Sequence, residues 1–262
     1  MTLNTDAALI WLVQFLLIFT RISAMFVLSP ILGRNSIPTA AKLGVSLLTA
    51  FMLINFYPPA VTDYPYDTLL SLSGAVLLEL LVGFVLGFGT ILFFNIVNTA
   101  GHIIDVQIGF SMSEQFDPAV GSQVPVTGNL LNIMFIECFL FADGIPRLVG
   151  IVGSTFQAIP IGGARISPEI AMAALEAFVN CFIFAINIAM PVLAASLLCE
   201  IGLGIIVRTA PQMNIFVIGI PIKIIVGLVA LAMAIPVFAR LTGVLFDRMY
   251  ETMDTLFTYM TP

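Results

Sequence analysis

The chain has 262 residues, of which 60% are hydrophobic and only 9% are charged. An ordinary soluble domain is about 45–50% apolar and about 25% charged, and so few polar residues cannot cover the surface of a soluble fold of this size. The net charge of −6 would also repel phosphate groups. The composition therefore excludes a free cytosolic enzyme, a disordered chain and a nucleic-acid binder. It indicates a polytopic membrane protein or a subunit buried among equally apolar partners.

Continuous apolar runs recur along the whole chain, and a helix that spans a bilayer needs roughly 20 such residues. The runs cover residues 7–32, 43–57, 69–97, 126–142, 170–207 and 215–239. Strands of a membrane barrel would instead alternate over about ten residues. The sequence therefore predicts an all-α membrane protein with about six spans, and a Gly/Pro-rich connection after the fourth run.

The distribution of basic residues does not agree with six simple crossings. Arg34 and Lys42 mark the first loop as cytoplasmic. Alternation then places residues 98–125 inside, where there is no Lys or Arg, and places Arg147 and Arg165 outside. Either the number of spans is wrong or some helices do not cross the bilayer in the usual way.

Charged residues interrupt the apolar runs: Arg21, Glu79, Glu137, Glu176, Glu200 and Lys223. A charge at a helix centre costs about 2.5–3.5 kcal/mol on insertion scales, so such residues rarely face lipid. They could form an ion or proton pathway, or they could be structural pairs or side chains that reach an interface. We favour the structural interpretation, because no two of them lie three or four residues apart. We also expect Glu79, Glu137 and Glu200 to pair with partner subunits or to line hydrated gaps.

Prolines and glycines also mark the apolar runs. Proline removes a backbone donor and crowds the preceding turn, so the helices that contain the prolines are expected to be bent, broken or re-entrant. These residues are Pro191, Pro211, Pro221 and Pro236. Gly83 and Gly87 have the GxxxG spacing, which permits close helix approach but is common by chance in Gly-rich apolar sequence.

Residues 104–113 alternate strictly between apolar and polar. This period is typical of extended chain with one apolar face, and residues 114–125 then read as turn. Such a stretch could lie in a protein-lined pore or be an exposed connector. The apolar face favours the pore.

Motifs for catalysis are missing from the sequence. His102 is the single histidine, and HExxH, a phosphate-binding loop and a nucleophile elbow are all absent. We therefore expect no enzyme activity, no metal and no cofactor.

Several ordered motifs resemble the FliR family of the flagellar type III protein export gate. They occur at residues 21–24, 30–33, 37–38, 109–112, 116–118, 156–162, 208–214 and 219–223. The resemblance implies a component of the bacterial inner membrane, within the flagellar basal body. It implies that one copy of this chain assembles with several copies each of FliP and FliQ into a pore that exports unfolded flagellar subunits. FlhA, FlhB, the exported polypeptides and membrane lipid are the other implied partners, and nucleic acid is not one.

The same resemblance implies a division of the chain. Residues 1–168 would form a FliP-like region and residues 169–262 a FliQ-like helical hairpin, whose turn holds Arg208, Pro211, Gln212 and Asn214. Residues 104–125 would form a plug-like loop that closes the pore. The residues assigned to closure are Ile108, Phe110, Met112, Phe116, Asp117 and Pro118.

Other functions remain open at this point. The homologous subunit of a virulence-type injection system would share the fold and differ in cargo. A secondary transporter would need matching half-repeats and a convergent polar site, which the sequence does not display. A purely structural scaffold would not need the alternating loop.

Overall fold

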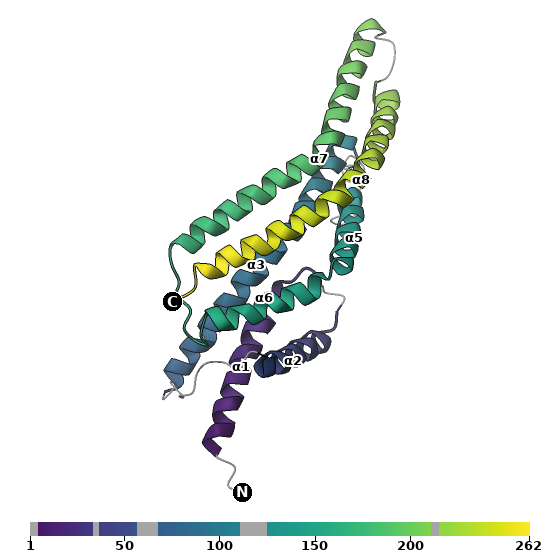
Figure 1. The fold of residues 1–262 in the computed structure, drawn as a ribbon. Helices are drawn as coiled ribbons and strands as arrows, with labels where there is room; N and C mark the ends of the chain where they lie inside the picture. Colours follow the sequence, from purple (N-terminus) through teal and green to yellow (C-terminus); the bar gives the residue numbers. More distant parts are fainter. Residues whose placement is uncertain (1–4, 34–36, 57–67, 111–124, 211–214) are drawn as a thin grey trace. The chain divides into compact units, whose positions relative to one another are not determined.

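The computed structural model describes residues 5–33, 37–56, 68–110, 125–210 and 215–262. All regular structure in these residues is helical (Figure 1). The helices are α1 (Thr5–Leu28), α2 (Thr39–Phe56), α3 (Leu69–Ile108), α5 (Val126–Phe141), α6 (Gly144–Ala158), α7 (Glu169–Thr209) and α8 (Ile215–Thr258). The predicted all-α class is confirmed.

Five of the described helices are long and apolar enough to cross a membrane, namely α1, α2, α3, α7 and α8. The fourth apolar run forms α5, which has only 16 residues and falls short of that length. The expectation of about six spans is therefore one too high for the described residues. At 1.5 Å per residue, α3, α7 and α8 are each about 60 Å long, twice the hydrocarbon thickness of a bilayer.

One expectation about local structure is wrong, and a second holds for only part of its range. Residues 104–108 are the last turn of α3, not extended chain, and Ile104 and Ile108 are both buried because they share one helical face. The first part of the expected Gly/Pro-rich connection forms α6, and residues 159–168 are not helical. Pro146 is compatible with α6 because it lies in the first turn, where the missing N–H of proline costs no helical hydrogen bond. The buried face of α6 carries Leu148, Val152 and Phe156.

The helices continue through the three prolines that the structure describes. Pro191 lies inside α7, and Pro221 and Pro236 lie inside α8. The sequence predicts bent, broken or re-entrant helices at these prolines, and a broken helix is therefore wrong at these three positions. Pro211 falls in residues 211–214, which lie outside the described residues between the end of α7 and the start of α8.

The chain forms two compact units, and α3, α7 and α8 each contribute to both. The first unit comprises residues 1–92, 143–178 and 246–262, and the second comprises residues 93–142 and 179–245. In the first unit α3 packs closely on α1. A Cβ on Gly83 would lie 2.3 Å from the carbonyl oxygen of Arg21, and one on Gly87 would lie 2.7 Å from Cβ of Leu28. The GxxxG spacing is therefore a real packing seam.

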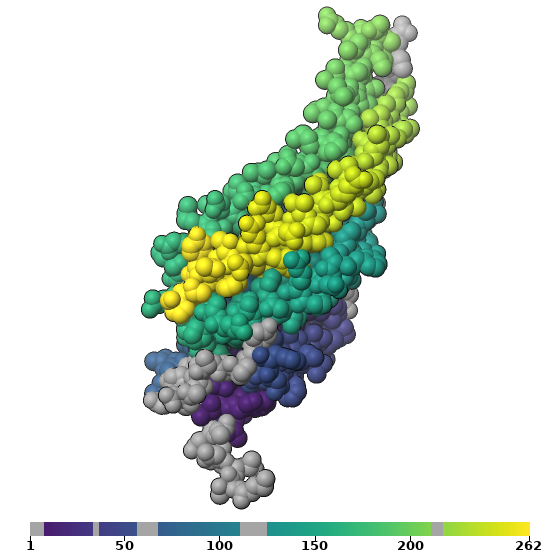
Figure 2. Space-filling model, viewed as in Figure 1, coloured from purple at the N-terminus to yellow at the C-terminus, as the bar shows by residue number. Residues whose placement is uncertain are grey.

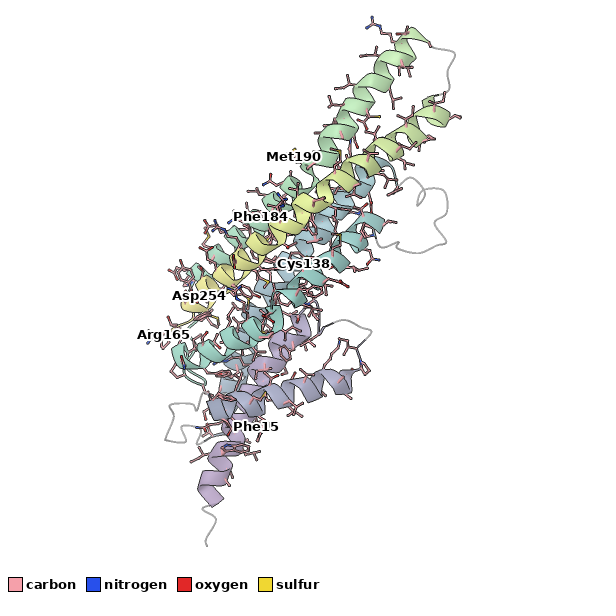
Figure 3. All side chains as sticks on the ribbon, turned by 45° about the vertical axis from the view of Figure 1, so that its right-hand side comes forward. Phe15, Cys138, Arg165, Phe184, Met190 and Asp254 are labelled. Carbon is pink, nitrogen blue, oxygen red and sulfur yellow. The ribbon has the colours of Figure 1, made fainter. Side chains whose placement is uncertain are left out.

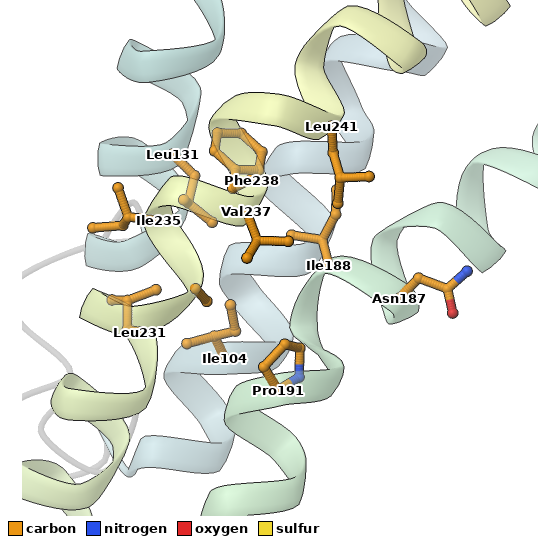
Figure 4. Close-up of a pocket in the computed structure, with 11 residues that line it drawn as sticks. Ile104, Leu131, Asn187, Ile188, Pro191, Leu231, Ile235, Val237, Phe238 and Leu241 are labelled. Carbon is orange, nitrogen blue, oxygen red and sulfur yellow. The ribbon is translucent and has the colours of Figure 1, made fainter.

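The second unit has an aromatic core. The Phe94 ring meets those of Phe135 and Phe139 edge to face, with centroids 4.9 and 5.4 Å apart. In this unit α7 and α8 lie side by side (Figures 1 and 2). An apolar cleft of about 400 Å³, including its opening, lies beside Pro191 and Phe238 (Figure 4). Exposed apolar side chains such as Met190 project from α7 (Figure 3).

Candidate functional site: the Asp105 anchor and the buried charges

The end of α3 and the start of α5 meet in the second unit, on either side of residues 111–124. α3 ends at Ile108 and is followed by Gly109, whose φ of 100° is the left-handed conformation that glycine adopts after helix C-termini. The backbone N–H groups of Gly109 and Phe110 both donate to the carbonyl oxygen of Asp105, each at 3.0 Å. The last described residues before the segment are therefore held by the backbone of Asp105.

The side chain of Asp105 holds the other end. Its two carboxylate oxygens lie 3.2 and 3.1 Å from the backbone nitrogen of Thr127, in the first turn of α5. A carboxylate is well placed there, because the first N–H groups of a helix have no helical acceptor. Asp105 is almost fully buried, and so is Thr127. We call Asp105 with these contacts the Asp105 anchor, since one residue fixes both ends of the segment.

A glycine contact reinforces the Asp105 anchor. A Cβ on Gly101 of α3 would lie only 2.1 Å from Cα of Gly128 in α5. The two helix backbones thus touch one turn before Asp105 and one residue after Thr127. Neither the Asp105 anchor nor this contact was predicted from the sequence. The available signal was a lone carboxylate four residues before a glycine, facing a helix start across the loop.

The residues assigned to pore closure are only partly described. Ile108 is fully buried and packs on α8, where a Cβ on Gly227 would lie 2.5 Å from its Cγ1 atom. Phe110 follows Gly109 and is partly exposed. Met112, Phe116, Asp117 and Pro118 lie outside the described residues. Their role in closure stays a prediction.

A buried ion pair forms the polar centre of the first unit. Nε of Arg21 in α1 lies 2.5 Å from Oε2 of Glu79 in α3, and the side chains are 0% and 1% exposed. Arg21 also donates to Oγ1 of Thr155 at 3.0 Å, and its guanidinium lies 4.1 Å from the centre of the Phe156 ring in α6. The pair therefore ties three helices together.

Glu79 has a further contact that extends this network. Its Oε1 atom accepts a hydrogen bond from the backbone N–H of Gly162 at 2.9 Å. Gly162 has a φ of 71°, so the turn after α6 needs a residue that adopts the left-handed conformation. The ion pair thus also fixes the turn that leads to α7. Glu79 was expected to pair with a partner subunit or to line a hydrated gap. In this structure it pairs instead with Arg21 of the same chain.

The remaining charges in the apolar runs have different surroundings. Lys223 of α8 donates to Glu200 of α7, and this ion pair is partly exposed. Glu137 of α5 is exposed, and no ion-pair partner for it occurs among the described residues. Glu176 is exposed on α7. The structure therefore brings four of these charges together as two pairs within the chain.

The predicted hairpin turn lies between α7 and α8. Arg208 is exposed in the last turn of α7, whereas Pro211, Gln212 and Asn214 lie outside the described residues. Glu200 pairs with Lys223, and further along the two helices Pro191 and Leu231 line the same cleft. These two contacts show that α7 and α8 run antiparallel in the second unit. His102 is exposed in α3, and the described residues contain no cluster of His, Cys, Asp and Glu that could hold a metal ion.

Comparison with known proteins settles the family. The model of the family "bacterial export proteins, family 1" matches residues 12–249. The chain belongs to this family. It is 30% identical over 248 residues to the flagellar biosynthetic protein FliR of Escherichia coli, covering 95% of this chain and 94% of the relative. It is 32% identical to FliR of Bacillus subtilis, covering 92% and 93%.

A relative from another secretion system is also similar. The Yop proteins translocation protein T of Yersinia pestis is 30% identical over 223 residues, covering 81% of this chain and 82% of the relative. The chain is thus similar both to proteins with flagellar names and to a protein with a translocation name. The resemblance to FliR that the sequence motifs indicated is confirmed over nearly the whole chain.

Proposed function

We propose that this chain is a subunit of the flagellar type III protein export gate, and that it forms a pore with FliP and FliQ. The observation that carries the proposal is the full-length match to proteins named flagellar biosynthetic protein FliR. Unfolded flagellar subunits would pass through this pore in the bacterial inner membrane, within the basal body. FlhA and FlhB would be neighbours in the same apparatus, and the energy for export would come from outside this chain.

The antiparallel pair of α7 and α8 supports the proposed FliQ-like hairpin at residues 169–262, after a FliP-like region at 1–168. The five long apolar helices are consistent with a membrane location. Co-expression with FliP and FliQ from the same genome, purification through a tag on this chain and native mass spectrometry test the assembly. A complex with several copies of each partner is expected. A stable monodisperse chain without them would instead favour the transporter.

We assign closure of the pore to residues 109–125, which follow the end of α3, with Phe110, Met112 and Phe116 as the closing side chains. Flexible apolar side chains can seal a narrow lumen against small solutes and still yield to a polypeptide. The Asp105 anchor supports this assignment, because it fixes Phe110 and Thr127, on either side of residues 111–124, to one residue of α3.

Deletion of residues 109–123 tests closure. The deletion is expected to leave assembly with FliP and FliQ intact and to raise permeability to ions and small solutes, measured in membrane vesicles. Replacement of residues 111–123 by a Gly/Ser linker of equal length is the matched variant. It should leak as well, because the closing side chains are lost while the chain length is kept. Unchanged permeability in both variants would contradict the assignment and favour a structural scaffold.

The alternative is a subunit of a virulence-type injection system, and the similarity to the Yersinia pestis protein favours it. Complementation separates the two functions. The chain is introduced into one strain lacking FliR and into another lacking the Yop proteins translocation protein T. Restored motility without restored secretion of Yop proteins supports the flagellar function, and the reverse result supports the alternative.

A further inference from the structure

The outward face of α5 carries a regular line of exposed residues. Their spacing along the helix is alternately four and three, and we call them the Glu137 seam: Val126, Leu130, Ile133, Glu137 and Leu140. The apolar members are 63%, 43%, 48% and 48% exposed in chain order. A spacing of four and three is the repeat by which one helix packs along another. The Glu137 seam therefore has the pattern of a helix–helix interface, but no helix of the described residues covers it.

The opposite face of α5 already has its partners. Phe135 and Phe139 meet Phe94 of α3, and Gly128 touches Gly101. These contacts fix the rotation of α5, so the Glu137 seam cannot turn inward without breaking the aromatic core of the second unit. The seam is thus a fixed outward surface of this unit.

Glu137 shows what kind of partner the seam fits. It occupies one seam position between Ile133 and Leu140, and it has no ion-pair partner among the described residues. Lipid chains do not accommodate a carboxylate in the middle of an apolar face. A single polar residue in a helix seam specifies the register and identity of the facing helix. A cationic side chain opposite Glu137 satisfies both requirements.

We propose that the Glu137 seam binds an apolar helix of another membrane subunit, and that this helix carries one Lys or Arg facing Glu137. The inference rests on the proposed function, which supplies the neighbouring subunits, and adds where on this chain one of them binds. The apolar seam residues provide the packing area, and the ion pair selects the partner and its register.

Photo-crosslinking in the assembled complex locates the partner. A photoreactive residue at Ile133 or at Leu140 is introduced into the tagged chain, which is co-expressed with FliP and FliQ. Crosslinks are expected to a single apolar helix of one of these proteins, within a turn of a Lys or Arg. Crosslinks to lipid only, or to residues 111–124 of the same chain, would overturn the proposal.

Charge substitutions test the ion pair. E137L and E137K are expected to lower the recovery of the crosslinked subunit by about tenfold or more, because a buried charge partner loses its counter-ion. E251K is the matched control, since Glu251 is an exposed glutamate whose ion pair with Arg248 lies on the surface. Reversing the charge of the crosslinked Lys or Arg should restore recovery with E137K and not with the unchanged chain.

The outcomes separate this inference from the proposed function. If the unchanged chain recovers neither FliP nor FliQ, the proposed function fails. If it recovers them and E137L and E137K recover them equally well, the Glu137 seam is not the interface and the proposed function stands.

Discussion

The buried ion pair of Arg21 and Glu79 gives a quantitative prediction. E79L leaves the Arg21 guanidinium fully buried without its counter-ion, and removing one partner of a buried pair costs about 3–5 kcal/mol. The variant also removes the acceptor of the Gly162 N–H. We expect the free energy of unfolding to fall by about 3–5 kcal/mol or more, because Thr155 and Phe156 cannot neutralise the Arg21 cation.

The double variant R21L/E79L should be more stable than either single variant. Replacing both members of a buried pair by apolar residues of similar size is often neutral or stabilising. Here the partly buried Gly162 N–H still loses its acceptor, and an unsatisfied group costs at most about 1–3 kcal/mol. The expected loss for the double variant is therefore about 1–3 kcal/mol, smaller than that for E79L.

Unfolding of the purified chain by SDS in mixed micelles, followed by circular dichroism, measures these differences. E251L is the control, because the ion pair of Glu251 with Arg248 is solvent-exposed and surface pairs contribute little. A double variant that loses the sum of the two single losses would refute the reasoning. It would mean that Arg21 and Glu79 act separately, as members of an ion pathway would.

Two further predictions concern close contacts around the same helix. G83V should destabilise the first unit severely and lower the amount of protein in membranes, because the valine side chain would meet the Arg21 carbonyl oxygen. G74V is the control and should have no such effect, since nothing lies within 4 Å of a Cβ at that position. Equal levels of the two variants on an immunoblot would contradict this prediction. D105A should increase small-solute permeability of the proposed pore, because the Thr127 N–H loses its acceptor, and D105N should leak less because it keeps one acceptor oxygen. Equal leakage of these two variants in membrane vesicles would show that the hydrogen bond is not what matters.

The helices could be predicted from the sequence wherever apolar runs were long. The runs beginning at residues 69, 126, 170 and 215 each match a helix start within one residue. The end of α3 could not be predicted, because residues 104–108 alternate in polarity over too short a stretch to distinguish the two periods. α6 was missed because its Gly and Pro residues favour a loop until their position in the first turn is known.

The pairing of the charges could be predicted only in part. The sequence favours structural pairing of these charges, but spacing along one helix cannot show which charges pair, because no two of them lie three or four residues apart. Arg21 and Glu79 are 58 residues apart and meet only because Gly83 lets α3 approach α1. The opposite signs of the charges in neighbouring apolar runs were the usable signal. For Glu137 the described part of the chain contains no ion-pair partner that such a signal could have indicated.

The failed topology count has a physical explanation in the helix lengths. The rule that places Lys and Arg inside assumes that each apolar run ends at a membrane surface. α3, α7 and α8 are about 60 Å long, so only about half of each can lie in a hydrocarbon core of about 30 Å. A basic residue at the end of such a helix therefore does not report the side of the membrane on which the nearest loop lies. Apolar helix outside the core needs another apolar surface, and under the proposed function the neighbouring subunits would supply it.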